Sequence, residues 1–411
     1  MIRALAAAVL VAGLLVVPAP MAFAACQPPP AAGQPIPAAA GRDPMIDRLG
    51  LPRVKDLSTG SGVTVAVVDS GVDSRHPKLA PAVIGGLDLA VVNDPRIFTE
   101  SPGSAEDCQN HGTMVAGLIA ARPLDDDRVV GVAPDAKIAA IRMVGTISDL
   151  PDALIAQAIR DGADRGSVLN LSFALPVDRP SIKAAVQYAL AKDVVVVAAA
   201  GNEQQSQPGQ TWYPAAYDGV LAVAAVDSNG APIAQSNQGP WVGIAAPGSD
   251  LTSTAAGGSG YLTQSGTSFA TAIVSGVAAL VRSRFPGLSG PAVVSRLVST
   301  AVPVAGKRDD KVGAGIVDPF AALTAPGVGT SSTSDRPGSV AVLPRPAEDA
   351  GFGPVLRAAL AWAGGLALAG LLAFVGGIAF RRAAHRRWRP GGRDDVREKA
   401  EAAEPTEVEL I

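Results

Sequence analysis

The chain has little net charge, few aromatic side chains, three histidines and only two cysteines in 411 residues. Its 34 Lys and Arg residues nearly balance 37 Asp and Glu residues, so no excess of one charge indicates nucleic acid as a partner. Aromatic residues make up 4% of the chain, and abundant Ala, Gly and Val favour an α/β interior packed with small side chains. No internal repeat is present, and the length fits one large domain with additional segments at its ends.

The N-terminal end, by contrast, is strongly apolar. Residues 1–25 contain Arg3, the stretch ALAAAVLVAGLLVV and a small-x-small site at 22–24, which together predict a signal peptide. The apolar core is shorter than the ~20 residues of a membrane-spanning helix. Cys26 follows directly and leaves a lipoprotein as an alternative, although the preceding FAA lacks the leucine usual at such a site.

A second apolar run lies near the C-terminus. Residues 358–380 contain no charge and are long enough to cross a bilayer, so they predict one transmembrane helix; a buried helix of a soluble domain is the alternative. The arginine-rich stretch after Phe380 is typical of a cytoplasmic flank. We therefore expect a single-pass type I protein in the cell membrane, with residues 381–411 as a cytoplasmic tail and the bulk of the chain outside.

Between these ends the composition indicates three segments. Residues 26–49 are predicted to be an N-terminal arm, whose Pro/Ala-rich part up to residue 44 should have no helix or sheet of its own. Residues 50–325 have a globular pattern. Residues 326–357 are rich in Pro, Gly, Ser and Thr and are predicted to be a linker to the membrane.

Apolar runs that suit β-strands alternate with helical patterns in the globular segment. Because the strands are apolar throughout, the pattern predicts an α/β fold with a mostly parallel sheet covered on both faces. The predicted strands are 63–69, 137–144, 167–173, 193–200 and 220–226, and the helical stretches between them are 151–166 and 180–193.

The two cysteines, Cys26 and Cys108, both lie on the predicted exported side. In an oxidising compartment such a pair indicates a disulfide, which would tie the arm to a distant point of the chain. Two free thiols are the alternative.

Ser268 stands at the start of a run of small residues, SGTSFATAIVSGVAAL, that looks helical. Taken alone it could be a helix N-cap. Asp69 ends a predicted strand and His111 begins another small-residue helix, whereas His76 and His385 lie in a loop and in the basic tail. Asp69 alone could equally cap a turn.

Together these three residues indicate nucleophilic catalysis. A histidine can take the proton of a serine hydroxyl, and a buried aspartate can fix the tautomer of that histidine and stabilise its charged form. Asn202 also ends a strand and would donate its amide to an oxyanion, with the backbone N–H of Ser268 as second donor. A turn asparagine is the alternative for Asn202.

The stretches VVDSGVD, HGTMVAG, AAAGN and GTSFATAIVSG resemble the four main blocks of the subtilases, the subtilisin-like serine proteases. The resemblance covers about residues 50–323 and implies a three-layer α/β fold. It also implies that Asp69, His111 and Ser268 are the catalytic triad and that Asn202 is the oxyanion residue.

Two departures from that family bear on activity. Where the family commonly has glycines that bind the substrate strand, Ser172 and Phe173 are followed by Ala174 and Leu175, so we expect a crowded cleft wall and narrow specificity. The arm is also too short and proline-rich to resemble a folded inhibitory prodomain, which implies an enzyme that needs no activation by removal of one.

The order of segments resembles the mycosins, membrane-anchored subtilases of type VII secretion systems. This resemblance implies protein or peptide substrates, hydrolysis of exported proteins, and association with the membrane complex of secretion. A mainly structural subunit of that complex, with proteolysis secondary, is the alternative function. No cofactor or metal is expected: DDD at 125–127 is predicted to be a solvated loop, because calcium sites draw spaced oxygens from a shaped loop.

Overall fold

A computed structural model describes residues 33–36, 43–92, 94–102, 106–124, 128–304, 306–327 and residue 381. The predicted signal peptide, much of the arm, the linker beyond residue 327, the predicted transmembrane segment and the tail beyond residue 381 lie outside these residues. Within them, no helix is both long enough and apolar enough to cross a membrane. The fold below is that of the described residues between 33 and 327, which belong to one unit.

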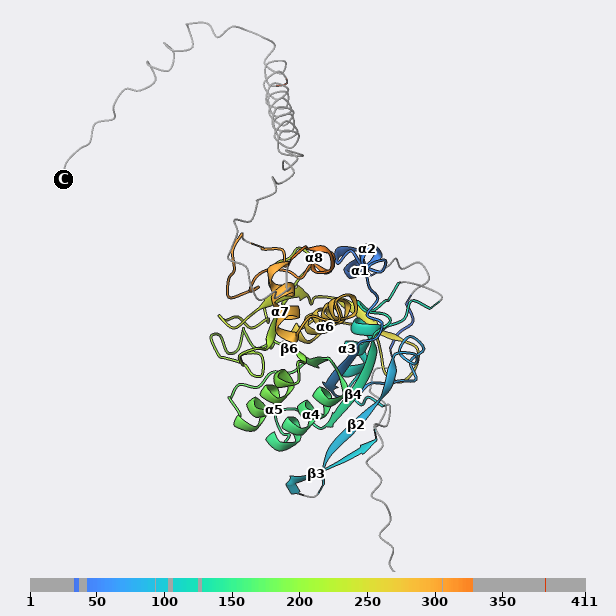
Figure 1. Cartoon of the computed structure of the whole chain (residues 1–411), viewed down its shortest axis with the longest axis vertical. Helices are drawn as coiled ribbons and strands as arrows, with labels where there is room; N and C mark the ends of the chain where they lie inside the picture. Colours follow the sequence, from blue (N-terminus) through green and yellow to red (C-terminus); the bar gives the residue numbers. More distant parts are fainter. Residues whose placement is uncertain are drawn as a thin grey trace, which may run out of the picture. The chain divides into compact units, whose positions relative to one another are not determined.

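An eight-stranded sheet forms the centre of this unit, in the order β3-β2-β4-β1-β5-β6-β7-β8 (Figure 1). All neighbouring strands run parallel except the edge pair β2 and β3, which is antiparallel. The strands are β1 Thr64–Asp69, β2 Val83–Val92, β3 Asp94–Pro102, β4 Lys137–Val144, β5 Val168–Leu171, β6 Val195–Ala199, β7 Leu221–Val226 and β8 Ile244–Pro247, with β9 Leu251–Thr254 and β10 Tyr261–Gln264 as a separate antiparallel pair.

Helices cover both faces of the sheet. Helices α3 and α6 contact each other and cover one face, whereas α4 and α5 cover the other. The helices are α1 Pro44–Arg48, α2 Leu51–Val54, α3 His111–Ala120, α4 Asp152–Arg165, α5 Pro180–Ala191, α6 Thr267–Arg284, α7 Gly290–Ser299 and α8 Pro319–Thr324.

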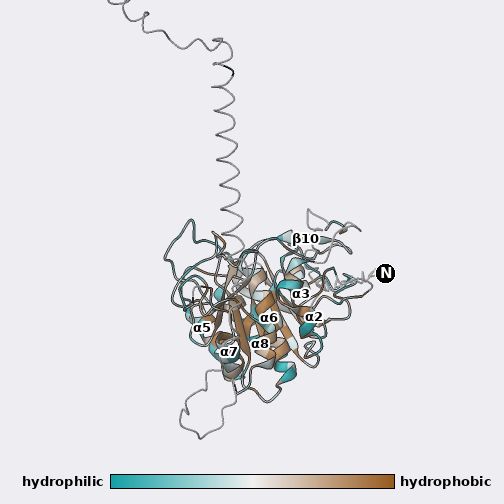
Figure 2. Cartoon of the chain, turned by 90° about the horizontal axis from the view of Figure 1, so that it is seen from above, coloured by the Kyte–Doolittle hydropathy of each residue, from teal (hydrophilic) through white to brown (hydrophobic). Residues whose placement is uncertain are grey.

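Strand β1 shows why the sequence folds in this way. Its side chains point alternately to opposite faces, so Val65 and Val67 join the core under α3 and α6, while Ala66 and Val68 join the core under α4. All four are buried. A strand buried on both faces needs apolar residues throughout, as in the central strands of parallel sheets. In Figure 2 the apolar colouring is concentrated in the middle of the molecule, around α6.

These features confirm the predicted α/β fold with a mostly parallel central sheet, in three layers. The described part of the arm belongs to this fold: it contains α1, and Met45, Ile46 and Leu49 join the core under α3 and α6. Gln34 forms an antiparallel bridge with Tyr261 of β10, and Asp43 caps α1 through the N–H of Met45.

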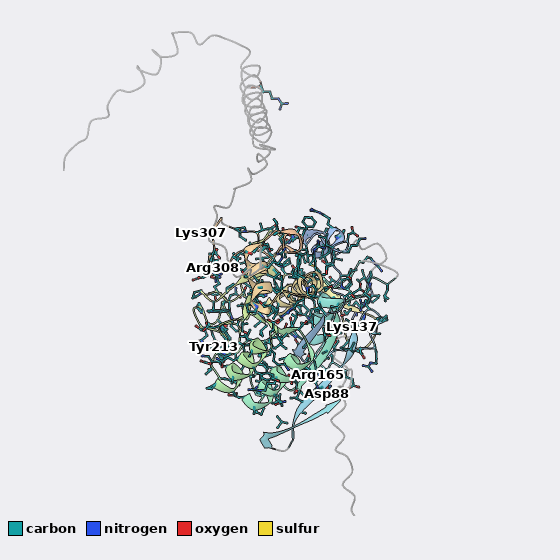
Figure 3. All side chains as sticks on the ribbon, viewed as in Figure 1. Asp88, Lys137, Arg165, Tyr213, Lys307 and Arg308 are labelled. Atoms are coloured by element: carbon teal, nitrogen blue, oxygen red, sulfur yellow. The ribbon has the colours of Figure 1, made fainter. Side chains whose placement is uncertain are left out.

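The antiparallel β2–β3 edge was not predicted. Asp88 of β2, labelled in Figure 3, makes a buried ion pair of 2.7 Å with Arg142 of β4.

Candidate active site

Asp69 and His111 meet at the carboxyl end of β1. Asp69 is the last residue of the strand and His111 the first residue of α3. The Nδ1 atom of His111 lies 2.7 Å from Oδ1 of Asp69, which also accepts the N–H of Ser70. This hydrogen bond keeps the proton on Nδ1 and leaves Nε2 of His111 able to accept a proton.

A buried carboxylate, Asp107, ties the start of α3 to the end of β1. Its Oδ1 accepts the hydroxyl of Ser70, and its Oδ2 accepts both the N–H and the hydroxyl of Thr113. The hydroxyl of Ser70 in turn accepts the N–H of Gly112. A side chain at Gly112 would meet the carbonyl oxygen of Gly71 at 2.1 Å, so only glycine allows this close approach.

Opposing effects act on the imidazole of His111. Burial lowers the pKa of His111, whereas the charge and hydrogen bond of Asp69 and the charge of Asp107 raise it, and the net shift is upward from 6.5. The ring also contacts Phe269 at the start of α6, with ring centroids 5.5 Å apart. The site therefore stabilises the imidazolium form of this histidine.

Ser268 is the second residue of α6 and is buried. Its hydroxyl donates to the carbonyl oxygen of Ser172, 3.1 Å away, rather than to His111. The hydroxyl of Ser172 donates in turn to the carbonyl oxygen of Ser268. The N-cap of α6 is Gly266, so the structure contradicts the simple alternative in which the Ser268 side chain caps this helix.

Asn202 lies three residues after the end of β6, beside the start of α6. Its Oδ1 accepts the N–H of Thr267 at 2.9 Å and the hydroxyl of Thr267 at 3.2 Å. With the oxygen held in this way, the amide nitrogen of Asn202 is oriented as a donor. Gly201, with φ of 97°, makes the turn and donates its N–H to the same Thr267 hydroxyl.

One cleft of about 310 Å³ brings these groups together. Asp69, His111, Asn202 and Ser268 all line it, and so do the predicted substrate-binding residues Ser172, Phe173 and Ala174. Other lining residues were not predicted. Most lie in loops, which carry no periodic pattern, whereas Val68, Met143, Ala199 and Thr267 belong to strands or to α6, where nothing in the sequence separates them from core residues. The residues that were not predicted are Val68, Ser70, Gln109, Met143, Gly145, Thr146, Ile147, Leu150, Ala199, Gly201, Glu203 and Thr267.

The expectation that Leu175 crowds the cleft wall was wrong. Leu175 is buried in the core shared with α4 and α5 and does not line the cleft. Its backbone exchanges hydrogen bonds of 2.7 and 2.9 Å with Tyr213, labelled in Figure 3. This bridge turns the Leu175 side chain inward, and Ala174 remains on the wall.

The remaining predicted residues lie at the edge of the described chain or beyond it. Cys108 is not a free thiol, and its Sγ lies 3.6 Å from Nη1 of Arg142. Cys26 and residues 125–127 lie outside the described residues. In the part of the chain that is described, no group of three His, Cys, Asp or Glu side chains could hold a metal ion.

Comparison with known proteins gives consistent results. The model of the subtilase family matches residues 60–320. Mycosin-3 of Mycobacterium tuberculosis is 37% identical over 79% of this chain and 86% of its own length. A crystal structure of MycP1 with its N-terminal propeptide removed is similar with a TM-score of 0.61 and 34% identity, over 71% of this chain and all of the other.

A chain in the structure of an intact ESX-5 inner membrane complex is also similar. Its TM-score is 0.60 and its identity 31%, over 86% of this chain and 93% of the other. The family match covers well over half of the present chain. This chain therefore belongs to the subtilase family of serine proteases, and its similar proteins include mycosins.

Proposed function

We propose that this protein is a membrane-anchored serine endopeptidase that hydrolyses peptide bonds of exported proteins through Asp69, His111 and Ser268. The observation that carries the proposal is the short Asp69–His111 hydrogen bond at the edge of a cleft that also contains Ser268 and Asn202. A Ser, His and Asp at one cleft form the constellation that activates a hydroxyl for acyl transfer.

In the proposed first step, the Ser268 hydroxyl turns from the carbonyl oxygen of Ser172 towards Nε2 of His111. This rotation of the side chain exchanges one neutral hydrogen bond for another. A bond of this kind contributes about 1 kcal/mol, and the free-energy cost of the exchange is smaller than that. Oγ of Ser268 then attacks the substrate carbonyl carbon while His111 takes the hydroxyl proton. His111 passes that proton to the leaving amine, and an acyl-enzyme remains.

Asn202 supports the intermediate of this step. Its amide nitrogen and the N–H of Ser268 would donate to the oxyanion, because Oδ1 of Asn202 is already held by Thr267. The first N–H groups of a helix have no acceptor within the helix, so that of Ser268 is available. In the second half of the reaction His111 activates a water molecule, which releases the acid and restores Ser268.

Covalent labelling tests the proposal directly. A fluorophosphonate probe should attach to Ser268 of the purified protein, as located by peptide mass spectrometry. Ser268→Ala and His111→Ala should not be labelled, whereas Asn202→Ala should be labelled slowly. Labelling of His111→Ala at the rate of the unchanged protein would disprove the triad.

We further propose that residues 358–380 anchor the protein with its catalytic domain on the extracytoplasmic side, after a signal peptide at 1–25. The support is the uncharged run and its arginine-rich flank. Protease added to intact spheroplasts should digest the catalytic domain and spare a C-terminal tag. Digestion of the tag from outside would contradict this topology.

Association with a type VII secretion complex is part of the proposal. It is supported by similarity to mycosins and to a chain of the ESX-5 inner membrane complex. That second similarity also favours the alternative of a mainly structural subunit. Ser268→Ala in the native host separates the two functions: a protease role requires that processing stops, whereas a structural role is supported if secretion survives in this variant and stops on deletion of the chain.

We also propose that Cys26 pairs with Cys108 and fastens the arm to the catalytic domain. The chain has no other cysteine, and Cys108 is not a free thiol. The closed loop is long, so chain entropy predicts a stabilisation of about 4 kcal/mol. The intact mass of the protein, determined before and after reduction, shows whether the disulfide is present. Two alkylatable thiols in the unreduced exported protein would refute it.

A further inference from the structure

The turn that carries Asn202 is held by a second asparagine, Asn237, from a distant part of the chain. Asn237 is 1% exposed and does not line the cleft. Its N–H donates to the carbonyl oxygen of Gly201, and its Nδ2 donates to that of Ala200, both at 3.0 Å. Its Oδ1 accepts the N–H of Glu203 at 2.9 Å. Asn237 therefore bonds to the residues on both sides of Asn202.

The side chain of Glu203 completes this network of hydrogen bonds. One of its carboxylate oxygens, Oε2, accepts the N–H of Asn202 at 2.7 Å and the second Nδ2 hydrogen of Asn237 at 2.9 Å. Both donors of the Asn237 amide and its acceptor are thus used on the turn. A buried amide with all these bonds made holds its partners in one arrangement.

The fit at Gly201 shows how closely Asn237 approaches the turn. A side chain at Gly201 would meet Nδ2 of Asn237 at 2.3 Å and Oε2 of Glu203 at 2.7 Å. The turn at 201–202 and the Asn237 amide therefore occupy adjoining space with no room for a methyl group. Thr267 fixes the side chain of Asn202, and Asn237 fixes the backbone on both sides of Asn202.

We propose that Asn237 is a positioning residue for the oxyanion site, acting through Asn202 without touching the substrate. The inference rests on the proposed oxyanion role of Asn202. An oxyanion donor stabilises the transition state only when it is held in advance at the position where charge develops. Loss of the side-chain hydrogen bonds of Asn237 lets the turn move. The amide of Asn202 then stabilises the transition state less well, while binding of the substrate changes little.

A double-mutant cycle on peptide hydrolysis tests this coupling. In the full-length protein, Asn237→Ala should lower kcat about 10- to 100-fold and change KM less than about threefold, as expected for an interaction made in the transition state. In the Asn202→Ala background the same change should lower kcat less than about threefold further, because residues acting through one contact are not additive. An equal loss in both backgrounds would overturn the inference.

Ser236→Ala is the matched control. Ser236 is as buried as its neighbour, but its hydroxyl accepts the N–H of Ala225 on β7 and does not bond to the turn. Its kcat should stay within about threefold of the unchanged protein, since a general loss of packing in this segment is not the proposed cause. A loss as large as that of Asn237→Ala would assign the effect to stability and refute a positioning role.

Asn237→Asp keeps the size of the side chain and its acceptor, so it remains informative if Asn237→Ala fails to fold. It removes both donors and puts a second carboxylate beside Glu203, and kcat should fall at least as far as in Asn237→Ala. Addition of Glu203→Gln removes the like-charge contact and should recover kcat at least about threefold. No loss in Asn237→Asp would overturn the inference. If Asn202→Ala itself leaves kcat nearly unchanged, the oxyanion assignment fails first.

Discussion

The two sides of the proposed catalytic cleft differ in how many of their side chains already contact the partners that the mechanism requires. On one side Asp69 and His111 are already joined at 2.7 Å. On the other side Asn202 is fixed by Thr267, but the Ser268 hydroxyl donates to the carbonyl oxygen of Ser172. The proposed base and the proposed oxyanion donor therefore each have a fixed partner, whereas the proposed nucleophile, Ser268, would have to rotate about its side chain to reach His111.

The largest loss of kcat is expected from removing the proposed nucleophile on one side of the cleft or the proposed base on the other. Ser268→Ala or His111→Ala should lower kcat about 10⁶-fold, and the double variant hardly further, because nucleophile and base act as one unit. Steady-state hydrolysis of a peptide substrate measures all three. Additive losses would show that the two residues act independently.

Asp69→Asn changes the partner of His111 and leaves Asn202 and Ser268, on the opposite side of the cleft, unchanged. Unlike the carboxylate, an asparagine amide can donate to Nδ1, so His111 can take the tautomer with its proton on Nε2, and kcat should fall about 10⁴-fold. The melting temperature should be recorded with the rates, since Asp69 is buried. A rate near that of the unchanged protein would mean that Asp69 does not orient His111.

Asn202→Ala changes the opposite side and should cost less. Removal of one oxyanion donor is expected to lower kcat about 10²–10³-fold, with little change in KM. Because the variant also removes the acceptor of the Thr267 N–H and hydroxyl, the melting temperature should be recorded with the rates. A rise in KM at unchanged kcat would instead make Asn202 a substrate-binding residue.

The smallest effect should come from pH. Because Asp69 and Asp107 outweigh burial and raise the pKa of His111 above 6.5, kcat/KM should fall about tenfold per pH unit below that raised pKa. Stability should respond with the opposite sign. The raised pKa stabilises the fold below the unfolded value, and this contribution is lost as pH rises through the folded one. A midpoint of this acid limb at a pH below 6.5 would contradict the upward shift of the His111 pKa.

Much of this site could be predicted because its residues mark the ends of regular elements. Asp69 ends β1, His111 begins α3 and Asn202 follows β6, and each follows or begins an apolar pattern readable in one short stretch. Strand β4 has the predicted bounds of 137–144. The antiparallel edge of β2 and β3 was missed, because its pairing joins polar and Gly-containing stretches without a continuous apolar run.

By itself, the sequence determined the α/β class, the order of strands β1, β4, β5, β6 and β7 and of helices α4 and α5 along the chain, and the positions of Asp69, His111 and Ser268 at the ends of elements. Tertiary structure alone decided that Leu175 enters the core, that the Ser268 hydroxyl bonds to Ser172, and that Asn237 holds the turn of Asn202. The physical reason is the separation along the chain of the residues that decide each feature. Element ends follow from local periodicity and turn chemistry, whereas a buried hydrogen bond depends on which distant segments the completed sheet brings within about 3 Å.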